Sequence, residues 1–164
     1  MTAPTLIFGW GNPSRGDDAL GPLLLDRIEA LLPDHPQWGA VDLLTDFQLQ
    51  VEHALDLDGR RRVLFVDASA AVLGAPFCVT RLEPARDSSF TTHALSPEGV
   101  MHVYAEMRAA PPPPCHLLAI GGQAFELGAP LSGAASANLD AALDWTRQWL
   151  ASPDSAYPPG GDGM

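Results

Sequence analysis

Apolar and polar residues follow one another along this chain in a pattern that predicts strands alternating with helices. Short apolar runs typical of buried strands occur at residues 6–8, 41–44, 63–66, 77–82 and 117–120. Apolar residues recur at helical spacing at residues 19–32, 49–57, 97–110 and 134–150. This alternation predicts a three-layer α/β/α fold, in which helices cover both faces of a mostly parallel sheet of about five strands.

Length and composition favour a single domain. The chain has 164 residues, of which 46% are hydrophobic and 18% charged, as is usual for one globular unit. We expect one α/β domain over residues 1–151 and a disordered tail over residues 152–164, which is rich in proline and glycine.

The amino terminus lacks the pattern of a signal peptide and no apolar run is long enough to span a bilayer, so the predicted location is cytoplasmic. Cys78 and Cys115 lie in apolar runs and are expected to be buried, reduced thiols.

The charge balance restricts the kinds of partner. The formal net charge is -11, and the only cluster of basic residues is Arg60-Arg61-Arg62. A protein with this charge repels phosphate groups, so we expect it to bind neither nucleic acid nor anionic membranes. A neutral, cationic or metal-bearing partner is favoured.

Sites in parallel α/β sheets lie outside the carboxyl ends of the strands. That rule selects the turn after the first predicted strand, Asp42 and Asp46 near the second, Asp67 after the third and His93 in the loop after the fourth.

The turn after the first strand has some features of a dinucleotide-binding loop. Gly9, Gly11 and Gly16 could allow a pyrophosphate to approach the backbone, with Asp42 or Asp46 on the ribose. However, Asp17 and Asp18 would then occupy the helix start where the phosphate belongs, and like charges would repel it. Nucleotide binding is therefore disfavoured.

The two adjacent aspartates are expected to have different roles. A carboxylate in the first turn of a helix stabilises the helix dipole, and one aspartate is enough for that purpose. Neighbouring side chains on a helix point about 100° apart, so the second aspartate could project over the carboxyl edge of the sheet. Considered alone, Asp67 could be a strand-end residue bonded to local backbone amides, and His93 could be an exposed histidine ahead of a helix cap. Two carboxylates and an imidazole at one edge would form a three-ligand cation site that favours Zn, Ni, Fe or Cu over Mg or Ca.

The remaining histidines and the tryptophans are interpreted as structural. His53, His102 and His116 are expected to be helix-surface or packing residues, and Trp145 with Trp149 to form the buried stripe of the last helix. No nucleophile elbow, zinc-protease helix or Cys-His signature indicates a conventional protease.

Several segments resemble the [NiFe]-hydrogenase maturation endopeptidases. The opening turn Gly9-Trp10-Gly11-Asn12, followed by Asp17-Asp18-Ala19-Leu20-Gly21, is similar to the signature of that family. Asp67 and His93 follow in the order and spacing of the family, and Ile120-Gly121-Gly122-Gln123 with Glu126-Leu127-Gly128 resembles its late glycine-rich segment. The resemblance covers residues 5–150.

This resemblance implies a function. Members of the family recognise nickel already inserted in the hydrogenase large-subunit precursor and remove a short C-terminal peptide. Carried over to this chain, the resemblance implies that Asp18, Asp67 and His93 contact the nickel of the substrate, with Asp17 as an anchor of the first turn. Three ligands on separate loops make an incomplete cage, so we expect no tightly held metal of the protein's own.

The resemblance leaves open the catalytic residue, the role of nickel and whether the protein cleaves a peptide at all. The family often has an Asp-Gly-Gly-Thr segment after the second strand, where this chain reads Leu44 to Gln50, and Asp46 is a candidate catalytic residue there. Nickel could activate the scissile carbonyl and an attacking water, or it could only position the peptide. The alternative function is a non-catalytic nickel-recognition or metallochaperone module on the same fold.

Overall fold

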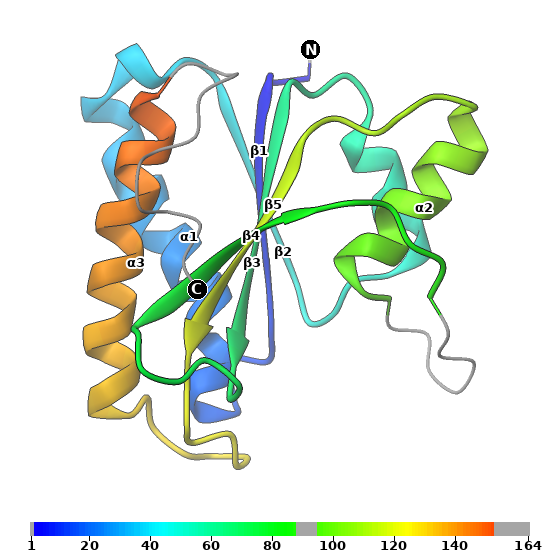
Figure 1. The fold of residues 1–164 in the computed structure, drawn as a ribbon. Helices are drawn as coiled ribbons and strands as arrows, with labels where there is room; N and C mark the ends of the chain where they lie inside the picture. Colours follow the sequence, from blue (N-terminus) through cyan, green and yellow to red (C-terminus); the bar gives the residue numbers. More distant parts are fainter. Residues whose placement is uncertain (1, 88–94, 153–164) are drawn as a thin grey trace.

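The computed structural model describes residues 2–87 and 95–152 and contains a five-stranded sheet between two layers of helices (Figure 1). The strands are β1 (Thr5–Trp10), β2 (Val41–Asp46), β3 (Arg62–Ser69), β4 (Phe77–Leu82) and β5 (Cys115–Gly121). Their order across the sheet is β2-β1-β3-β5-β4, and all neighbours are parallel except β4, which is antiparallel to β5. The predicted α/β class and the mostly parallel sheet are confirmed.

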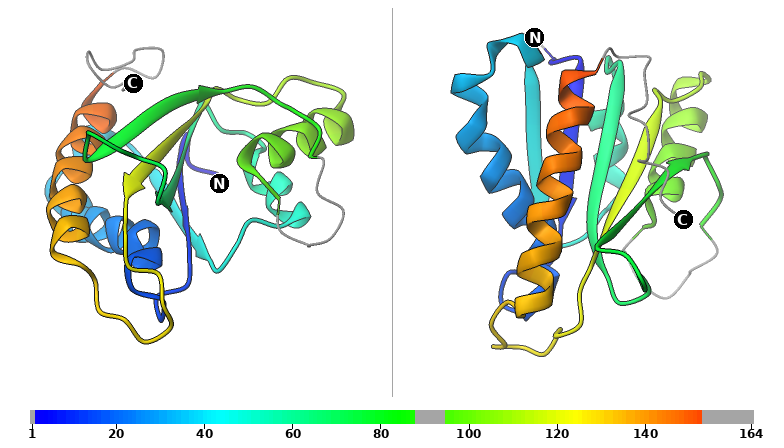
Figure 2. Two further views of the ribbon diagram at one scale, coloured as in Figure 1. Left: turned by 60° about the horizontal axis from the view of Figure 1, so that its bottom comes forward. Right: turned by 60° about the vertical axis from the view of Figure 1, so that its left-hand side comes forward.

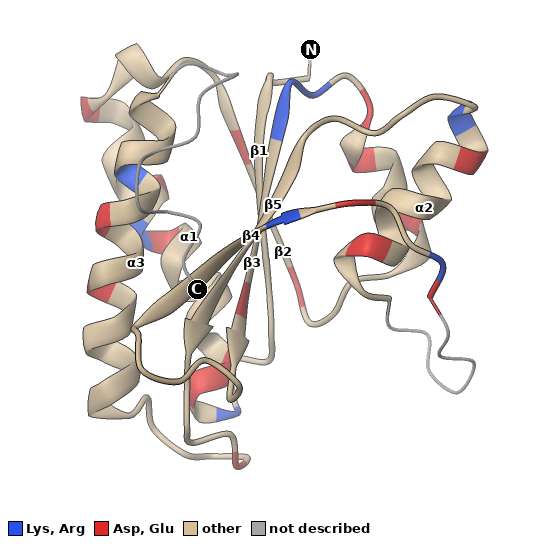
Figure 3. Cartoon of the chain, viewed as in Figure 1, with Lys and Arg blue, Asp and Glu red and all other residues tan. Residues whose placement is uncertain are grey.

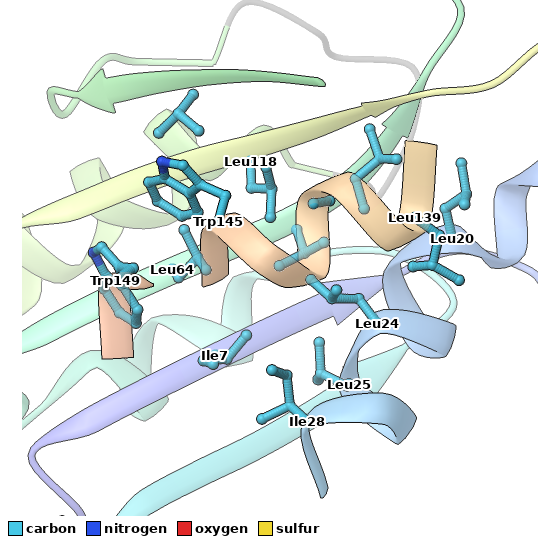
Figure 4. Close-up of a cluster of buried hydrophobic side chains, with 14 of the residues drawn as sticks. Ile7, Leu20, Leu24, Leu25, Ile28, Leu64, Leu118, Leu139, Trp145 and Trp149 are labelled. Atoms are coloured by element: carbon cyan, nitrogen blue, oxygen red, sulfur yellow. The ribbon is translucent and has the colours of Figure 1, made fainter. Parts of the chain in front are cut away.

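One face of the sheet is covered by α1 (Leu20–Leu31) and α3 (Gly133–Ala151), which lie side by side in Figures 1 and 2. Residues that alternate along the strands point to this face, among them Ile7, Leu64 and Leu118, and they pack against both helices (Figure 4). Trp145 and Trp149 belong to this cluster, as the helical spacing predicted.

The opposite face is covered by the short helix η4 (Val51–Leu57) and by α2 (Pro97–Arg108). Here the alternate strand residues Leu6, Phe8 and Phe65 pack against both elements. Ser96 caps α2 by accepting a hydrogen bond from the Gly99 amide at 3.0 Å, and Pro97 occupies the first turn.

The predicted helix at residues 49–57 differs in type, because the structure has a 3-10 helix there that begins at Val51. Gln50 and His53 form a reciprocal capping pair at its start, and Asp58 is already extended. The segment has seven residues, which is about two 3-10 turns. It is too short for α-helical hydrogen bonds to stabilise one another cooperatively.

Several elements are longer or divided differently from the prediction. The third strand continues through Asp67 to Ser69, and Asp67 pairs with Ala119 in the ladder instead of ending the strand. The first predicted helix consists of the 3-10 turn η1 (Gly16–Ala19), α1, and a second 3-10 turn, η2 (Leu32–Asp34); a third, η3 (Pro36–Trp38), leads to β2. Cys115 is a buried free thiol as expected, whereas Cys78 is only partly buried.

Ser152 directly follows α3, and the rest of the expected tail lies outside the described residues. In residues 2–87 and 95–152, no helix has both the length and the apolar character needed to cross a bilayer.

Candidate functional site

The candidate site lies at the edge where the parallel strands end, at the bottom of Figure 1 and brought forward in the left view of Figure 2. The opening turn follows β1 at this edge and leads into η1. Gly11 has a φ of 148°, and a Cβ there would lie 1.9 Å from the Asp18 carbonyl oxygen. Glycine is therefore required for the backbone to pass this closely over η1.

Asp18 faces this opening turn. Its Oδ2 accepts a hydrogen bond from the Asn12 amide at 2.7 Å, and the residue is only partly buried. The carboxylate keeps further lone pairs available, because each of its oxygens can accept more than one hydrogen bond. Asp18 is thus held in place while remaining able to bind another group.

Asp67 lies close to Asp18 across the sheet edge. Burial raises the pKa of the Asp67 carboxyl to about 7, and the negative charge of Asp18 adds to this increase, although a hydrogen bond from the Ala68 amide opposes it. Figure 3 shows the acidic segments of η1 and of the end of β3 at this same edge. Two carboxylates that disfavour each other's charge form a suitable site for a cation.

No arginine neutralises these groups among the residues described: none of the ion pairs there involves Asp18 or Asp67. His93, the third predicted ligand, lies outside the described residues. Within residues 2–87 and 95–152, no three histidine, cysteine, aspartate or glutamate side chains are close enough together to hold a metal ion. The described part of the site therefore supplies two carboxylates.

Asp17 has a different environment from its neighbour. It is fully buried, and its carboxylate accepts hydrogen bonds from the amides of Gln123, Ala124 and Ser132 and from the Ser132 hydroxyl, at 2.7 to 3.0 Å. Burial would raise the pKa of Asp17, but these four bonds outweigh that effect and lower it. Asp17 is an anchor, as predicted, but it fastens η1 to the loop after β5 instead of capping its own helical turn.

The glycine-rich segment after β5 is thereby connected to the site. Ile120 and Gly121 end the strand, and Gln123 supplies one of the amides that hold Asp17. Ser132 also caps α3 by accepting from the Ala135 amide at 3.1 Å. The start of α3, the loop after β5 and the opening turn are consequently fixed relative to one another.

The two aspartates predicted near the second strand lie at opposite ends of β2. Asp42 is paired with Leu6 near the start of both strands and is bonded to Arg60 and to the Ala3 amide, so its selection as an edge residue was wrong. The strand is two residues longer than predicted, which places Asp46 at its end. The Asp46 carbonyl accepts from the Gly11 amide at 3.1 Å, so Asp46 adjoins the opening turn.

His53 was interpreted from the sequence as a surface or packing residue, and its bond to Asp46 was missed. Its Nε2 lies 3.1 Å from Asp46 Oδ2, and its ring packs edge-on against Phe8 with 4.6 Å between the centroids. The two residues are seven positions apart on different elements, so no helical or strand periodicity connects them. The Gln50–His53 spacing at the start of η4 allows a capping pair and so gave a local signal for the role of His53 in η4, but not for its bond to Asp46.

The other two histidines lie away from this edge. His102 is on α2 beside Glu106, with 3.1 Å between Nε2 and Oε1. His116 is buried near the start of β5, where burial, with a contribution from the charge of Arg81, lowers the pKa of the ring to about 4. Both are consistent with the structural roles predicted for them.

No family model matches this sequence, and no curated protein matches it either. Solved structures do resemble the fold. The hydrogenase maturating endopeptidase HybD from E. coli is 23% identical, with 89% of this chain and 91% of that chain covered and a TM-score of 0.64. The [NiFe] hydrogenase maturation protease HycI from Thermococcus kodakarensis KOD1 is 21% identical over 92% and 94%, with a TM-score of 0.64.

A hydrogenase 2 maturation peptidase from a Thaumarchaeota archaeon is 23% identical over 89% of this chain and 97% of that one, with a TM-score of 0.60. Likeness at this level of identity concerns the fold alone. The chain has the fold of solved hydrogenase maturation proteases over about nine-tenths of its length.

Proposed function

We propose that this protein is an endopeptidase that removes the C-terminal peptide of a [NiFe]-hydrogenase large-subunit precursor after nickel insertion. The observation that carries the proposal is the pair of carboxylates Asp18 and Asp67 at this edge of the sheet: burial raises the pKa of Asp67 to about 7, and the nearby charge of Asp18 adds to the increase. The shared fold and the resemblance of the opening turn also support it. A cytoplasmic location stays a prediction from the sequence.

Nickel is part of the substrate in this proposal. Asp18, Asp67 and His93 would contact the ion in the precursor and so hold the adjoining C-terminal segment against the sheet edge. Binding of this kind contributes by orienting the scissile bond, which is worth several kcal/mol in well-aligned reactions, on the order of 7 or more. The proposal does not require nickel to take part in bond cleavage.

Asp46 is the proposed general base. Its side chain is 42% exposed and lies beside the opening turn. In the proposed step Asp46 takes a proton from water as the water oxygen adds to the scissile carbonyl carbon. The proton then passes to the departing amine as the C–N bond breaks.

The deciding experiment presents nickel-loaded and nickel-free precursor separately and reads each C-terminus by intact mass. We expect trimming of the nickel-loaded form alone, and its loss in Asp18→Ala but not in Asp26→Ala, an exposed aspartate on α1. Equal trimming of both forms contradicts nickel recognition. Binding without any mass change favours the non-catalytic nickel-recognition module.

A second experiment tests the cation site without precursor. Two described carboxylates make an incomplete cage, so the purified protein should contain little metal but should bind added Ni, Zn or Cd. Asp18→Asn should weaken this binding in a calorimetric titration. Stoichiometric metal in protein purified without added ions would instead indicate a permanent metal centre.

A further inference from the structure

The ring of His53 has a hydrogen-bond partner at each nitrogen. Nδ1 lies 2.8 Å from the Gln50 amide nitrogen, and Nε2 lies 3.1 Å from Asp46 Oδ2. A backbone amide only donates, so Nδ1 must accept and carries no proton. In the neutral ring the proton is therefore on Nε2, which donates it to Asp46.

This arrangement limits what His53 can do. Neither nitrogen has a lone pair left for a metal ion or for taking a proton from substrate. The side chain is only 12% exposed and packs against the Phe8 ring. His53 can thus influence the reaction only through Asp46.

Asp46 itself is fixed at both carboxylate oxygens. Oδ1 accepts from the Phe47 amide at 2.7 Å, and Oδ2 accepts from His53. The residue lines a cleft of about 280 Å³, which is also lined by Gly11, Pro13, Pro22, Thr45 and Phe47. An aspartate at a strand end without these bonds would rotate between side-chain rotamers.

We propose that His53 is a positioning residue, which holds the Asp46 carboxylate in one orientation in the cleft beside the opening turn. This inference rests on the proposed function, in which Asp46 accepts a proton from the attacking water. A partner that fixes a reacting carboxylate usually affects activity about 10- to 100-fold, because small displacements of the reacting atoms are costly.

Two substitutions separate the two bonds of His53. His53→Gln places a side-chain NH₂ near the position of Nε2 and so retains a donor for Asp46, but it loses the acceptor for the Gln50 amide. His53→Asn places a side-chain oxygen near the position of Nδ1 and so retains that acceptor, but it is too short to reach Asp46. Glu52→Gln, on an exposed position of the same helix, is the control for general effects on η4.

We expect opposite orders for activity and stability. His53→Asn should lower kcat for nickel-loaded precursor about 10- to 100-fold with little change in KM, while melting at a higher temperature than His53→Gln, because both variants lose the ring contact with Phe8 but only His53→Asn keeps the acceptor for the Gln50 amide. His53→Gln should restore kcat to within about threefold of wild type while melting at a lower temperature. If the two variants rank alike in kcat and in melting temperature, or if His53→Asn keeps the wild-type kcat, His53 has only a structural role and the inference is wrong.

A spectroscopic measurement tests the geometry independently of processing. In ¹⁵N-histidine NMR spectra, the resonances absent from His53→Gln identify the His53 ring. We expect an unprotonated Nδ1 and a protonated Nε2, and Asp46→Ala should shift the Nε2 signal. If wild type fails to process the precursor, the proposed function fails, whereas a protonated Nδ1 in wild type overturns the inference about His53.

Discussion

Where β1 and β3 begin, charged groups are paired with partners inside the protein. Arg60 donates to Asp42 and holds the pKa of that carboxyl below its usual range, and the buried Arg62 donates to carbonyls at the end of α3. At the opposite end of the sheet, Asp18, Asp46 and Asp67 form no ion pair with arginine in the described part of the chain. Charge pairs stabilise the fold at the first end, whereas the three carboxylates at the second end are the groups that we propose to act on the substrate.

The largest effect is expected for the three residues that we propose to contact the nickel of the substrate. Asp18→Ala, Asp67→Ala and His93→Ala should each lower precursor processing by about 100-fold or more, because each removes a proposed contact to the nickel of the substrate. For Asp18 and Asp67, the free energy of unfolding should change by less than about 1 kcal/mol, since these side chains have few internal partners. Intact-mass kinetics and urea unfolding measure the two quantities. If two of the three variants process the precursor fully, these residues do not form the site.

The next largest effect is a loss of stability on replacing Arg62, which lies where β3 begins. Its guanidinium donates to Thr5 Oγ1 at 3.0 Å and to the carbonyls of Trp149 and Leu150 at 2.8 and 3.2 Å, and it lies 4.3 Å from the centre of the Trp149 ring. Arg62→Met leaves these buried carbonyls without that donor, so the free energy of unfolding should fall by about 3 to 4 kcal/mol. Processing per folded molecule should not change.

Arg61 provides the matched control for this prediction, because it is the adjacent arginine and is exposed. Arg61→Met should change the free energy of unfolding by less than about 1 kcal/mol in the same urea titration. Similar losses in both variants would mean that net charge, and not the buried contacts of Arg62, determines the stability of this end.

Asp17 lies at the end of the sheet where the parallel strands finish, yet its carboxylate is fully hydrogen-bonded inside the protein. Asp17→Ala removes the acceptor of four hydrogen bonds and should lower the free energy of unfolding by about 2 to 4 kcal/mol. The pKa of Asp17 is lowered in the folded state. Its contribution is therefore complete above the unfolded pKa of about 4 and is lost as the pH falls through the folded pKa.

Urea unfolding of wild type and Asp17→Ala from pH 7 down to pH 3 measures this dependence. The difference between the two proteins should narrow below about pH 4, because the unfolded wild-type chain takes up a proton on Asp17 at a higher pH than the folded protein does. A difference that widens toward low pH would show that the pKa of Asp17 is raised, and not lowered, in the folded state.

The sequence predicted the layers and most elements because their cause is local. The alternation at residues 6–8 and 63–66 and the helical spacing at residues 134–150 appear in the structure as strand faces and a buried helix face. The antiparallel direction of β4 was not specified, because an apolar run such as Phe77–Leu82 has the same pattern in either direction.

The site was predicted less completely because its contacts are distant in sequence. The angle between neighbouring side chains predicted different roles for the two aspartates, and the resemblance to the family named Asp17 as the anchor, but neither indicated its partners, which lie more than 100 residues away on the loop after β5. The end of β2 was placed two residues early, so Asp42 and Asp46 were grouped although they lie at opposite ends of the strand. The bond from His53 to Asp46 depends on how η4 packs on Phe8, which no local pattern reveals.

The smallest effect is expected for a charge pair that belongs to neither end. Arg27 on α1 and Asp140 on α3 lie 3.2 Å apart, with side chains that are 47% and 70% exposed. Exposed pairs gain little because water screens the charges and both side chains lose freedom, so a double-mutant cycle with Arg27→Ala and Asp140→Ala should give a coupling of less than about 0.5 kcal/mol. Buried apolar residues between the helices, including Leu24 and Leu139, hold them together without the pair. A coupling above about 1 kcal/mol would show that an exposed ion pair can stabilise this protein nearly as much as a buried hydrogen bond does. The expected difference between exposed charges and the buried Arg62 would then be wrong.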